Sequence, residues 1–200
     1  MGSISNIRIK KHRMPKGLII ISDSNQVGIS HKLIVPTIKL LYLKRGYDCT
    51  VINLHQTGFD PMLPPSNIDS KNNAITKAYK HYFKTADQIH FISNKHTGGL
   101  SAGIEGFLEH VVTNGFAYQY DGTKLISRVK NKEVFFHVHN SYKNITKFDS
   151  IWFRIKLSKL PKLFKSCNIY QSDLSWANQK SKNKKIKKLR DTLIKKLFNE

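Results

Sequence analysis

The sequence predicts an α/β protein with a five-stranded parallel sheet and helices on both faces of that sheet. Short, continuously apolar runs recur along the chain, as in strands that are buried on both faces. Between them lie segments with the apolar period of helices, long enough for right-handed crossovers between parallel strands. The 200 residues, 40% of them hydrophobic, fit a single domain with a substantial core.

The predicted elements fill residues 16–200, after a basic N-terminal arm at residues 1–15. The five strands are expected at Lys16–Ile21, Tyr47–Leu54, Gln88–Ile92, Lys132–Val138 and Asn168–Ser172. The helices are expected at Ser30–Arg45, Asn73–Thr85, Ala102–Val112, Ser150–Leu160 and Asn178–Phe198. Gly46 and Gly115 follow the first and third helices, as glycines typically do at helix C-termini. The proline-rich stretch between residues 55 and 70 predicts a loop.

The charge balance and the cysteines narrow the class of protein. There are 34 Lys and Arg against 13 Asp and Glu, a net charge of +21, which attracts nucleic acid, phospholipid surfaces or phosphorylated small molecules. Cys49 and Cys167 form neither a disulfide framework nor a zinc motif, and predict buried thiols in a reducing, cytoplasmic setting. No apolar run approaches the roughly 20 residues that span a bilayer, so membrane insertion is not expected.

Three polar loops follow predicted strands and mark the expected ligand site. Ligands of open α/β sheets bind outside the carboxyl ends of the strands, which selects Ser22–Ser30, Ser93–Gly99 and His139–Asn144. In the first loop, polar groups meet a helix start whose backbone N–H groups suit a phosphate. Ordinary N-capping by Ser30 or Ser24 is the structural alternative. The chain has neither a glycine-rich dinucleotide fingerprint nor a Walker loop.

The second and third loops offer groups for a flat ligand and for proton transfer. Gly98 and Gly99 let the backbone approach a planar ring closely, although a solvated surface loop explains them equally well. His139 could act as a proton donor near neutral pH, whereas a histidine at a strand end is more often structural. His137 and His139 share one strand face, but no nearby Cys, Asp or Glu completes a metal set, so zinc is rejected.

Three motifs between about Lys16 and Val138 carry the strongest functional signal. They are E-G-F-L-E-H-V-V-T-N-G-F-A-Y at Glu105–Tyr118, F-D-P-M-L at Phe59–Leu63 and A-D-Q-I-H-F at Ala86–Phe91. In order and spacing they resemble motifs of the NAD(P)H:quinone oxidoreductase family, whose members are flavodoxin-like proteins that bind FMN or FAD. The resemblance implies a flavodoxin-like, doubly wound fold.

The family's flavin-contacting motifs are less well preserved. Its P-L-x-W-G segment falls on Asn94–Gly98, where only the glycine remains, and its T-T-G-G segment falls on His139–Tyr142, where neither glycine remains. Its H-P-x-x-x-S-F-N opening falls on Asp23–Ser30, where Ser30 corresponds well. The motifs that match are therefore distinct from those that contact the flavin ring.

The resemblance implies a flavin-dependent NAD(P)H dehydrogenase that passes two electrons to a quinone or a similar small-molecule acceptor. The expected catalytic residues are His139 and Tyr142. The expected cofactor-binding residues are Ser24, Ser30, Asn94, Lys95, His96, Thr97, Gly98, Gly99, Asn140 and Ser141. FMN is preferred to FAD because the chain ends soon after the fifth strand, with little left to wrap an adenosine. The family also implies a homodimer.

The basic C-terminal segment leaves a second interpretation open. Lys180–Glu200 holds nine basic and two acidic residues, and Ile186, Leu189 and Leu193 recur at helical spacing, so that one face of a helix docks on the protein. A solvated outer face explains the remaining lysines, and a nucleic-acid phosphate footprint is the functional alternative. Under that alternative the chain is a non-catalytic, flavodoxin-like binding module with a basic surface.

Overall fold

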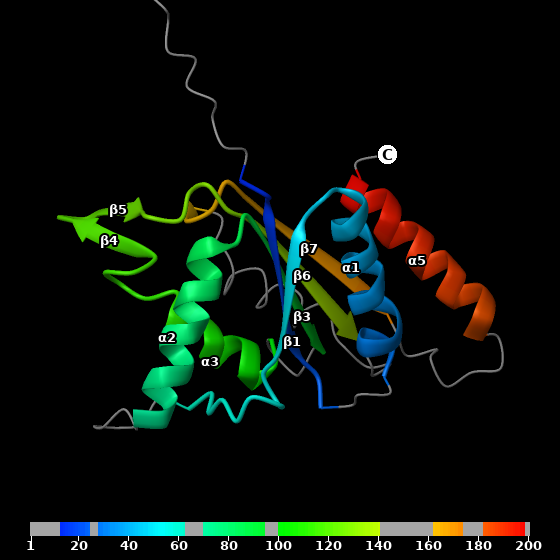
Figure 1. Cartoon of the computed structure of the whole chain (residues 1–200), viewed down its shortest axis with the longest axis horizontal. Helices are drawn as coiled ribbons and strands as arrows, with labels where there is room; N and C mark the ends of the chain where they lie inside the picture. Colours follow the sequence, from blue (N-terminus) through cyan, green and yellow to red (C-terminus); the bar gives the residue numbers. More distant parts are fainter. Residues whose placement is uncertain are drawn as a thin grey trace, which may run out of the picture.

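A parallel sheet of five strands forms the centre of the protein (Figure 1). The computed structural model describes residues 13–24, 28–62, 70–94, 100–140, 162–173 and 182–198. In spatial order the strands are β2 (Asp48–Asn53), β1 (Lys16–Ser22), β3 (Gln88–Asn94), β6 (Glu133–Asn140) and β7 (Ser166–Asp173). Every neighbouring pair is parallel, which confirms the predicted fold class. β3 and β6 each run two residues beyond their predicted carboxyl ends.

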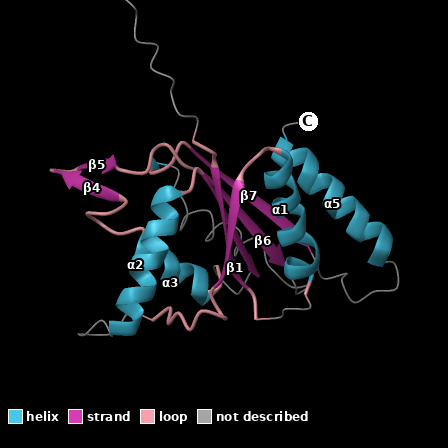
Figure 2. Ribbon diagram, in the orientation of Figure 1, coloured by secondary structure: helices cyan, strands magenta, loops and turns pink. Residues whose placement is uncertain are grey.

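Helices cover both faces of this sheet (Figure 2). One face carries a π-helical turn η1 (Ser30–Ile34), its continuation α1 (Val35–Lys44), and α5 (Lys182–Phe198). The opposite face carries α2 (Ser70–Thr85) and α3 (Ala102–Val111). The helix predicted at Ser150–Leu160 lies outside the described residues. The strand order places β1 between β2 and β3, so the chain winds outward from the centre in both directions.

An antiparallel hairpin, which the sequence analysis did not assign, follows α3. It consists of β4 (Tyr118–Asp121) and β5 (Lys124–Ser127). Gly122 opens the turn between them with φ of +57°, a left-handed value that two-residue hairpin turns require and that glycine adopts without steric cost. The Asp-Gly pair at 121–122 is the sequence signal that predicts such a turn.

The core is divided by the sheet, because successive strand side chains point to opposite faces. Toward α2 and α3 the strands present mainly apolar side chains near their middles. These residues include Leu18, Ile20, Ile89, Phe91, Val134 and Phe136, which pack with Phe83 of α2 and Phe107 of α3. Toward α1 and α5 they present Ile19, Ile21 and Ile92, together with the buried histidines His90, His137 and His139.

The motifs that resemble those of quinone oxidoreductases make contacts that stabilise this fold. A Cβ atom on Gly106 would lie 2.4 Å from the carbonyl oxygen of Pro61, so glycine is what lets α3 approach the loop after β2. Phe59 in that loop packs against Tyr79 and His110, with ring centroids 5.4 Å apart in each pair. Asp87 accepts a hydrogen bond of 2.8 Å from the backbone N–H of Lys16 and so fixes the start of β1. These residues of the matching motifs therefore have structural roles in the fold.

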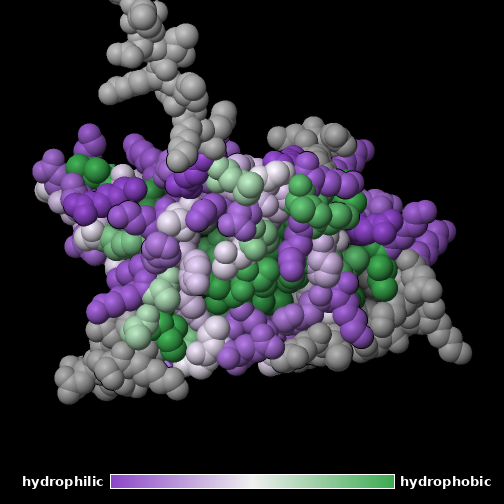
Figure 3. Space-filling model, in the orientation of Figure 1, coloured by the Kyte–Doolittle hydropathy of each residue, from purple (hydrophilic) through white to green (hydrophobic). Residues whose placement is uncertain are grey.

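The surface in the orientation of Figure 1 is mostly hydrophilic. Figure 3 shows hydrophobic residues gathered near the middle of this face, over the β1–β2 edge of the sheet between α2 and α1, and over α1 itself. Leu40 and Leu43 of α1 and Val51 of β2 are among the large exposed hydrophobic side chains. Among the described helices, none combines the length and apolar character that crossing a membrane requires.

Candidate functional site

The carboxyl ends of β1, β3 and β6 lie side by side at one edge of the sheet. Ser22 is opposite Ser93, and Asn94 is opposite His139, so the three predicted ligand-binding loops begin from neighbouring positions. Of the predicted cofactor-binding and catalytic residues, Ser24, Ser30, Asn94, His139 and the backbone of Asn140 are described. The others lie outside the described residues, namely Lys95, His96, Thr97, Gly98, Gly99, Ser141 and Tyr142.

Where the first loop starts, at the end of β1, the chain is held by burial and by a hydrogen bond. Asp23 is buried and its backbone carbonyl accepts a hydrogen bond of 3.2 Å from His31 Nε2, while Ser24 is exposed. Ser30 is buried as the first residue of η1, and the cap position is held by Ile29, which forms no side-chain cap. The N-capping role considered for Ser30 is therefore not realised.

The second loop is closed at its base by two serines. The backbone N–H of Ser101 donates to Ser93 Oγ at 3.0 Å, and the two hydroxyl oxygens are also 3.0 Å apart. Both side chains are buried, so their hydrogen bonds contribute more than exposed ones do. A Cβ atom on Gly103 would lie 2.5 Å from Ser22 Oγ, which means that the first turn of α3 sits directly on the end of β1.

His139 does not begin the third loop, as the sequence analysis expected. It lies within β6, opposite Ser172 of β7, and its side chain is buried. Burial lowers its pKa to about 4, against a smaller opposing effect of Asp23. His139 is consequently neutral at pH 7, and the prediction that it donates a proton near neutral pH does not fit its surroundings.

A buried histidine pair lies on the same face of the sheet as His139. His90 Nδ1 and His137 Nε2 share a hydrogen bond of 2.8 Å, and their rings are nearly parallel, with centroids 5.1 Å apart. Burial lowers the pKa of His90 to about 3 and that of His137 well below its usual value. The ring of Tyr42 meets His90 edge-on at 5.4 Å, and that of Tyr170 lies 5.3 Å from His137. His90, His137 and His139 form a row of buried histidines on this face, and all three are therefore uncharged at pH 7.

The histidine row and the cysteines do not form a metal centre. Within the described part of the chain, no three His, Cys, Asp or Glu side chains are arranged to hold a metal ion. Cys49 and Cys167 are half-buried and free, rather than fully buried as predicted, and burial raises the pKa of both thiols to about 11. Both thiols are protonated at neutral pH and are poor nucleophiles.

A hollow that the sequence analysis did not identify lies beside the end of β2. It has a volume of about 560 Å³ and is lined by Leu54, His55, Gly58, Phe59, Pro61, Leu100, Ala102, Gly103 and Glu105. The volume falls in the range of small-molecule sites, and most of the walls are apolar. His55 Nε2 lies 3.4 Å from Ser22 Oγ, which links the hollow to the end of β1. His55 directly follows the predicted strand Tyr47–Leu54, and this polar residue was the sequence signal that could have indicated the hollow.

Comparison with known proteins identifies the family. The model of a family described as having a flavodoxin-like fold matches residues 16–147. The chain belongs to this flavodoxin-like family. A curated relative, an uncharacterised NAD(P)H oxidoreductase of Haemophilus influenzae, is 25% identical over 121 residues. The match covers 58% of this chain and 60% of the relative, so the flavodoxin-like protein spans about three fifths of that relative's length.

Solved structures share the fold over most of the chain. A crystal structure from Streptococcus mutans has a TM-score of 0.69 at 17% identity, covering 88% of this chain and 97% of that one. An FMN-dependent NADH-azoreductase from Bacillus anthracis, in complex with FMN, has a TM-score of 0.66 at 12% identity and covers 90% and 99%. An NAD(P)H:quinone oxidoreductase from Methanothermobacter marburgensis has a TM-score of 0.58 at 17% identity and covers 81% and 87%. At these identities the likeness establishes the fold.

Proposed function

We propose that this flavodoxin-like protein is a flavin-dependent oxidoreductase, which takes two electrons from NAD(P)H and passes them to a quinone or a similar small-molecule acceptor. The observation that carries the proposal is the meeting of β1, β3 and β6 at one edge of the sheet, where Ser22 is opposite Ser93 and Asn94 is opposite His139. The relative named as an NAD(P)H oxidoreductase and the neighbour crystallised with FMN support it.

FMN fits the donors at this edge. Ser24 offers an exposed hydroxyl at the end of β1, and Asn94 offers a half-buried amide at the end of β3. These uncharged hydrogen-bonding groups, on a chain of net charge +21, suit an anionic phosphate and the heteroatoms of a ring. Ser30, Asn140 and the residues of the second and third loops complete the proposed set. Bound flavin would supply the hydride-accepting chemistry that the protein's own side chains lack.

The chain's own residues would position the reactants. The base of the second loop, closed by Ser93 and Ser101, would hold the loop against the ring, and neutral His139 beneath it would add no charge at pH 7. The hollow beside β2 would admit an apolar, planar acceptor.

We further propose a homodimer formed through the exposed apolar residues of α1 and β2. We also propose a reducing, cytoplasmic location, in keeping with the two free thiols.

Flavin retention is the decisive test. The purified protein is incubated with FMN or FAD and desalted, and the retained flavin is identified by absorbance and mass. NADH or NADPH oxidation is then followed with menadione and, separately, with an azo dye as acceptor. We expect retained FMN and acceptor-dependent oxidation. Absence of both would refute the proposal and favour the non-catalytic binding module.

A charge placed at the end of β1 tests the site itself. Ser24→Asp sets a carboxylate where the phosphate is expected, and we expect it to weaken FMN binding at least about tenfold by like-charge repulsion. Thr123→Asp in the hairpin turn is the matched control, because Thr123 is also exposed. Both variants are titrated by quenching of flavin fluorescence. Equal affinities for the two variants would place the phosphate elsewhere.

A further inference from the structure

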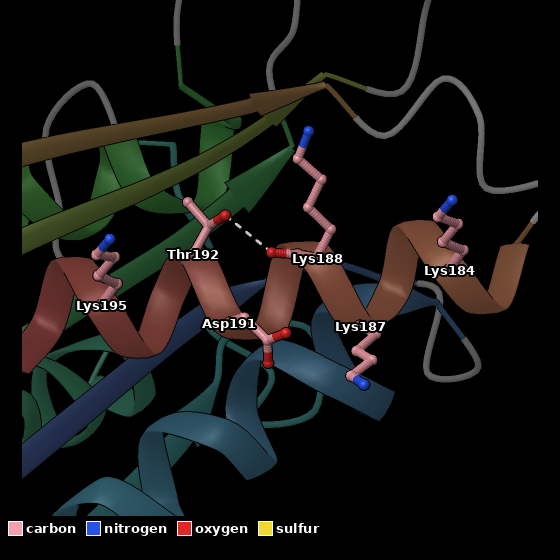
Figure 4. A pocket seen from close by; sticks show the side chains of 6 residues that line it. All are labelled: Lys184, Lys187, Lys188, Asp191, Thr192 and Lys195. Atoms are coloured by element: carbon pink, nitrogen blue, oxygen red, sulfur yellow. Dashed lines mark hydrogen bonds between the residues drawn. The ribbon is translucent and has the colours of Figure 1, made fainter.

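Helix α5 presents a row of lysines to the solvent. Lys184, Lys187, Lys188 and Lys195 are exposed and line a shallow groove of about 350 Å³ along the helix, together with Asp191 and Thr192. Figure 4 shows Lys184, Lys188 and Lys195 pointing to one side of the helix, and Lys187 and Asp191 pointing to the other. The groove therefore runs between two rows of side chains, most of which carry positive charge. The four lysines on its two sides are together called the lysine row.

Within the described part of the chain, little neutralises this charge. Across α5 there are eight basic residues and a single acidic one, Asp191. Asp191 lies 3.7 Å from Arg190 of the same helix, and none of the four groove lysines takes part in the ion pairs formed among the described residues. Like charges at helical spacing destabilise a helix slightly, so the row reduces the stability of the free protein and favours an anionic partner.

The apolar face of α5 is already occupied. Leu193 is buried in the core cluster that includes Ile34 and Ile38, and Leu189 packs against the same cluster. On a helix, Leu193 is opposite the lysine row, about half a turn away from it. Among the described side chains of α5, no further apolar stripe remains with which to enter a bilayer, as membrane-surface helices do. Binding by its free face must be electrostatic.

We propose that the lysine row of α5 binds the phosphate backbone of double-stranded nucleic acid without sequence preference. From Lys184 to Lys195 the helix rises about 16 Å, which matches about five base pairs of a duplex. Four lysines that each neutralise one phosphate give a slope of log affinity against log salt of about −3.6. The net charge of +21 adds long-range attraction. This surface is separate from the proposed flavin site.

The test compares two variants of the full chain that lose the same charge. In one, Lys184, Lys187, Lys188 and Lys195 are all replaced by Gln; in the control, four exposed lysines on α2 and the hairpin region, Lys77, Lys84, Lys124 and Lys130, are replaced by Gln. Binding to a fluorescein-labelled duplex of mixed sequence is measured by anisotropy from 50 to 200 mM salt. A third variant, with Arg at the four α5 positions, keeps the charge. Circular dichroism checks that each variant is folded.

We expect the α5 Gln variant to bind the duplex about 100-fold more weakly at 50 mM salt, with the salt slope reduced by about 3 to 4. The control and the Arg variant should stay within about threefold of the parent. Equal losses in both Gln variants would overturn the proposal in favour of net charge alone, and an unchanged affinity would also overturn it. Stronger, α5-dependent binding to phosphatidylserine vesicles than to the duplex would assign the surface to membranes instead.

Discussion

The two faces of the central sheet share the same strands but differ in chemistry. Toward α2 and α3, Phe91 and Phe136 stack with centroids 4.8 Å apart, and the ring of Phe107 meets that of Phe91 edge-on. Toward α1 and α5, the corresponding stack is made by His90 and His137. A neutral, hydrogen-bonded imidazole fills a buried position much as phenyl does, yet it retains a site for a proton. Between about pH 4 and pH 7, stability should therefore depend on pH through the histidine face. On the opposite face the buried Lys132, whose pKa is lowered by burial to about 8, adds pH dependence only above that range.

The largest expected effect lies on the apolar face. Phe107→Ala removes a fully buried ring that contacts Phe83 and Phe91. We expect the free energy of unfolding to fall by about 3–5 kcal/mol, from lost burial and the cavity that is left. Urea denaturation at pH 5 and at pH 7.5 measures it. The loss should be the same at both pH values, and a pH-dependent loss would contradict the division into two faces.

Acid should destabilise the histidine face. Folding lowers the pKa of His90 from 6.5 to about 3 and that of His139 to about 4, so below pH 6.5 the unfolded chain binds more protons than the folded chain. The free energy of unfolding should fall by up to about 1.4 kcal/mol per pH unit for each such histidine between pH 6.5 and about 4. Above pH 6.5 these groups add no pH dependence.

Replacing one histidine isolates this effect. His90→Gln keeps an amide beside His137 but removes a titrating group, so the loss of stability between pH 7 and pH 5 should shrink by about 2 kcal/mol. Phe136→Leu on the opposite face is the control and should leave the pH slope unchanged. Denaturant titrations at half-unit pH intervals measure both slopes. If His90→Gln keeps the parent's slope, His90 is not a source of the acid sensitivity.

A close backbone contact on the apolar side gives the next prediction. Gly106→Ala places a methyl group 2.4 Å from the Pro61 carbonyl oxygen, and backbone must move to accommodate it. We expect a loss of about 1–3 kcal/mol, measured by thermal or urea unfolding. Gly46→Ala, where nothing lies within 4 Å but φ is +69°, separates steric crowding from backbone strain. If Gly106→Ala leaves the free energy of unfolding unchanged, the loop after β2 moves freely away from α3.

The smallest effect is expected from Tyr42 on the histidine face. Its hydroxyl is buried and forms no hydrogen bond with the described residues, and burial raises its pKa well above the usual value. Tyr42→Phe removes this unsatisfied group, so the free energy of unfolding should rise, by less than about 1 kcal/mol. Chemical denaturation compares the variant with the parent. A loss of stability would mean that the hydroxyl contributes a favourable interaction.

Strand and helix positions were predictable because burial imposes a local apolar pattern. All five strands of the sheet lie within two residues of their expected ends, and the apolar run that became β1 is continuous because both of its faces are covered. The hairpin at 118–127 was missed although Asp121 and Gly122 signal a turn. Its strands are short and mostly half-exposed, so they lack the apolar run that marks the others.

The candidate site was less predictable, since it depends on contacts between distant segments. His139 resembled the start of a polar loop, but the pairing of β6 with both β3 and β7 buries it inside a strand. The His90–His137 hydrogen bond joins residues 47 apart in sequence, and no local pattern reveals it. The hollow beside β2 likewise combines residues from the loop after β2 with residues at the start of α3.

The serine pair at the base of the second loop has a consequence for how this protein can change over evolutionary time. Because Ser93 and Ser101 fasten the two ends of the intervening stretch to the frame, substitutions between them need not disturb the folding of the rest. In the sequence, the segment that differs from the tryptophan-containing motif of quinone oxidoreductases, Asn94–Gly98, lies between these two serines. Substitutions in this stretch can therefore accumulate while the architecture is inherited intact.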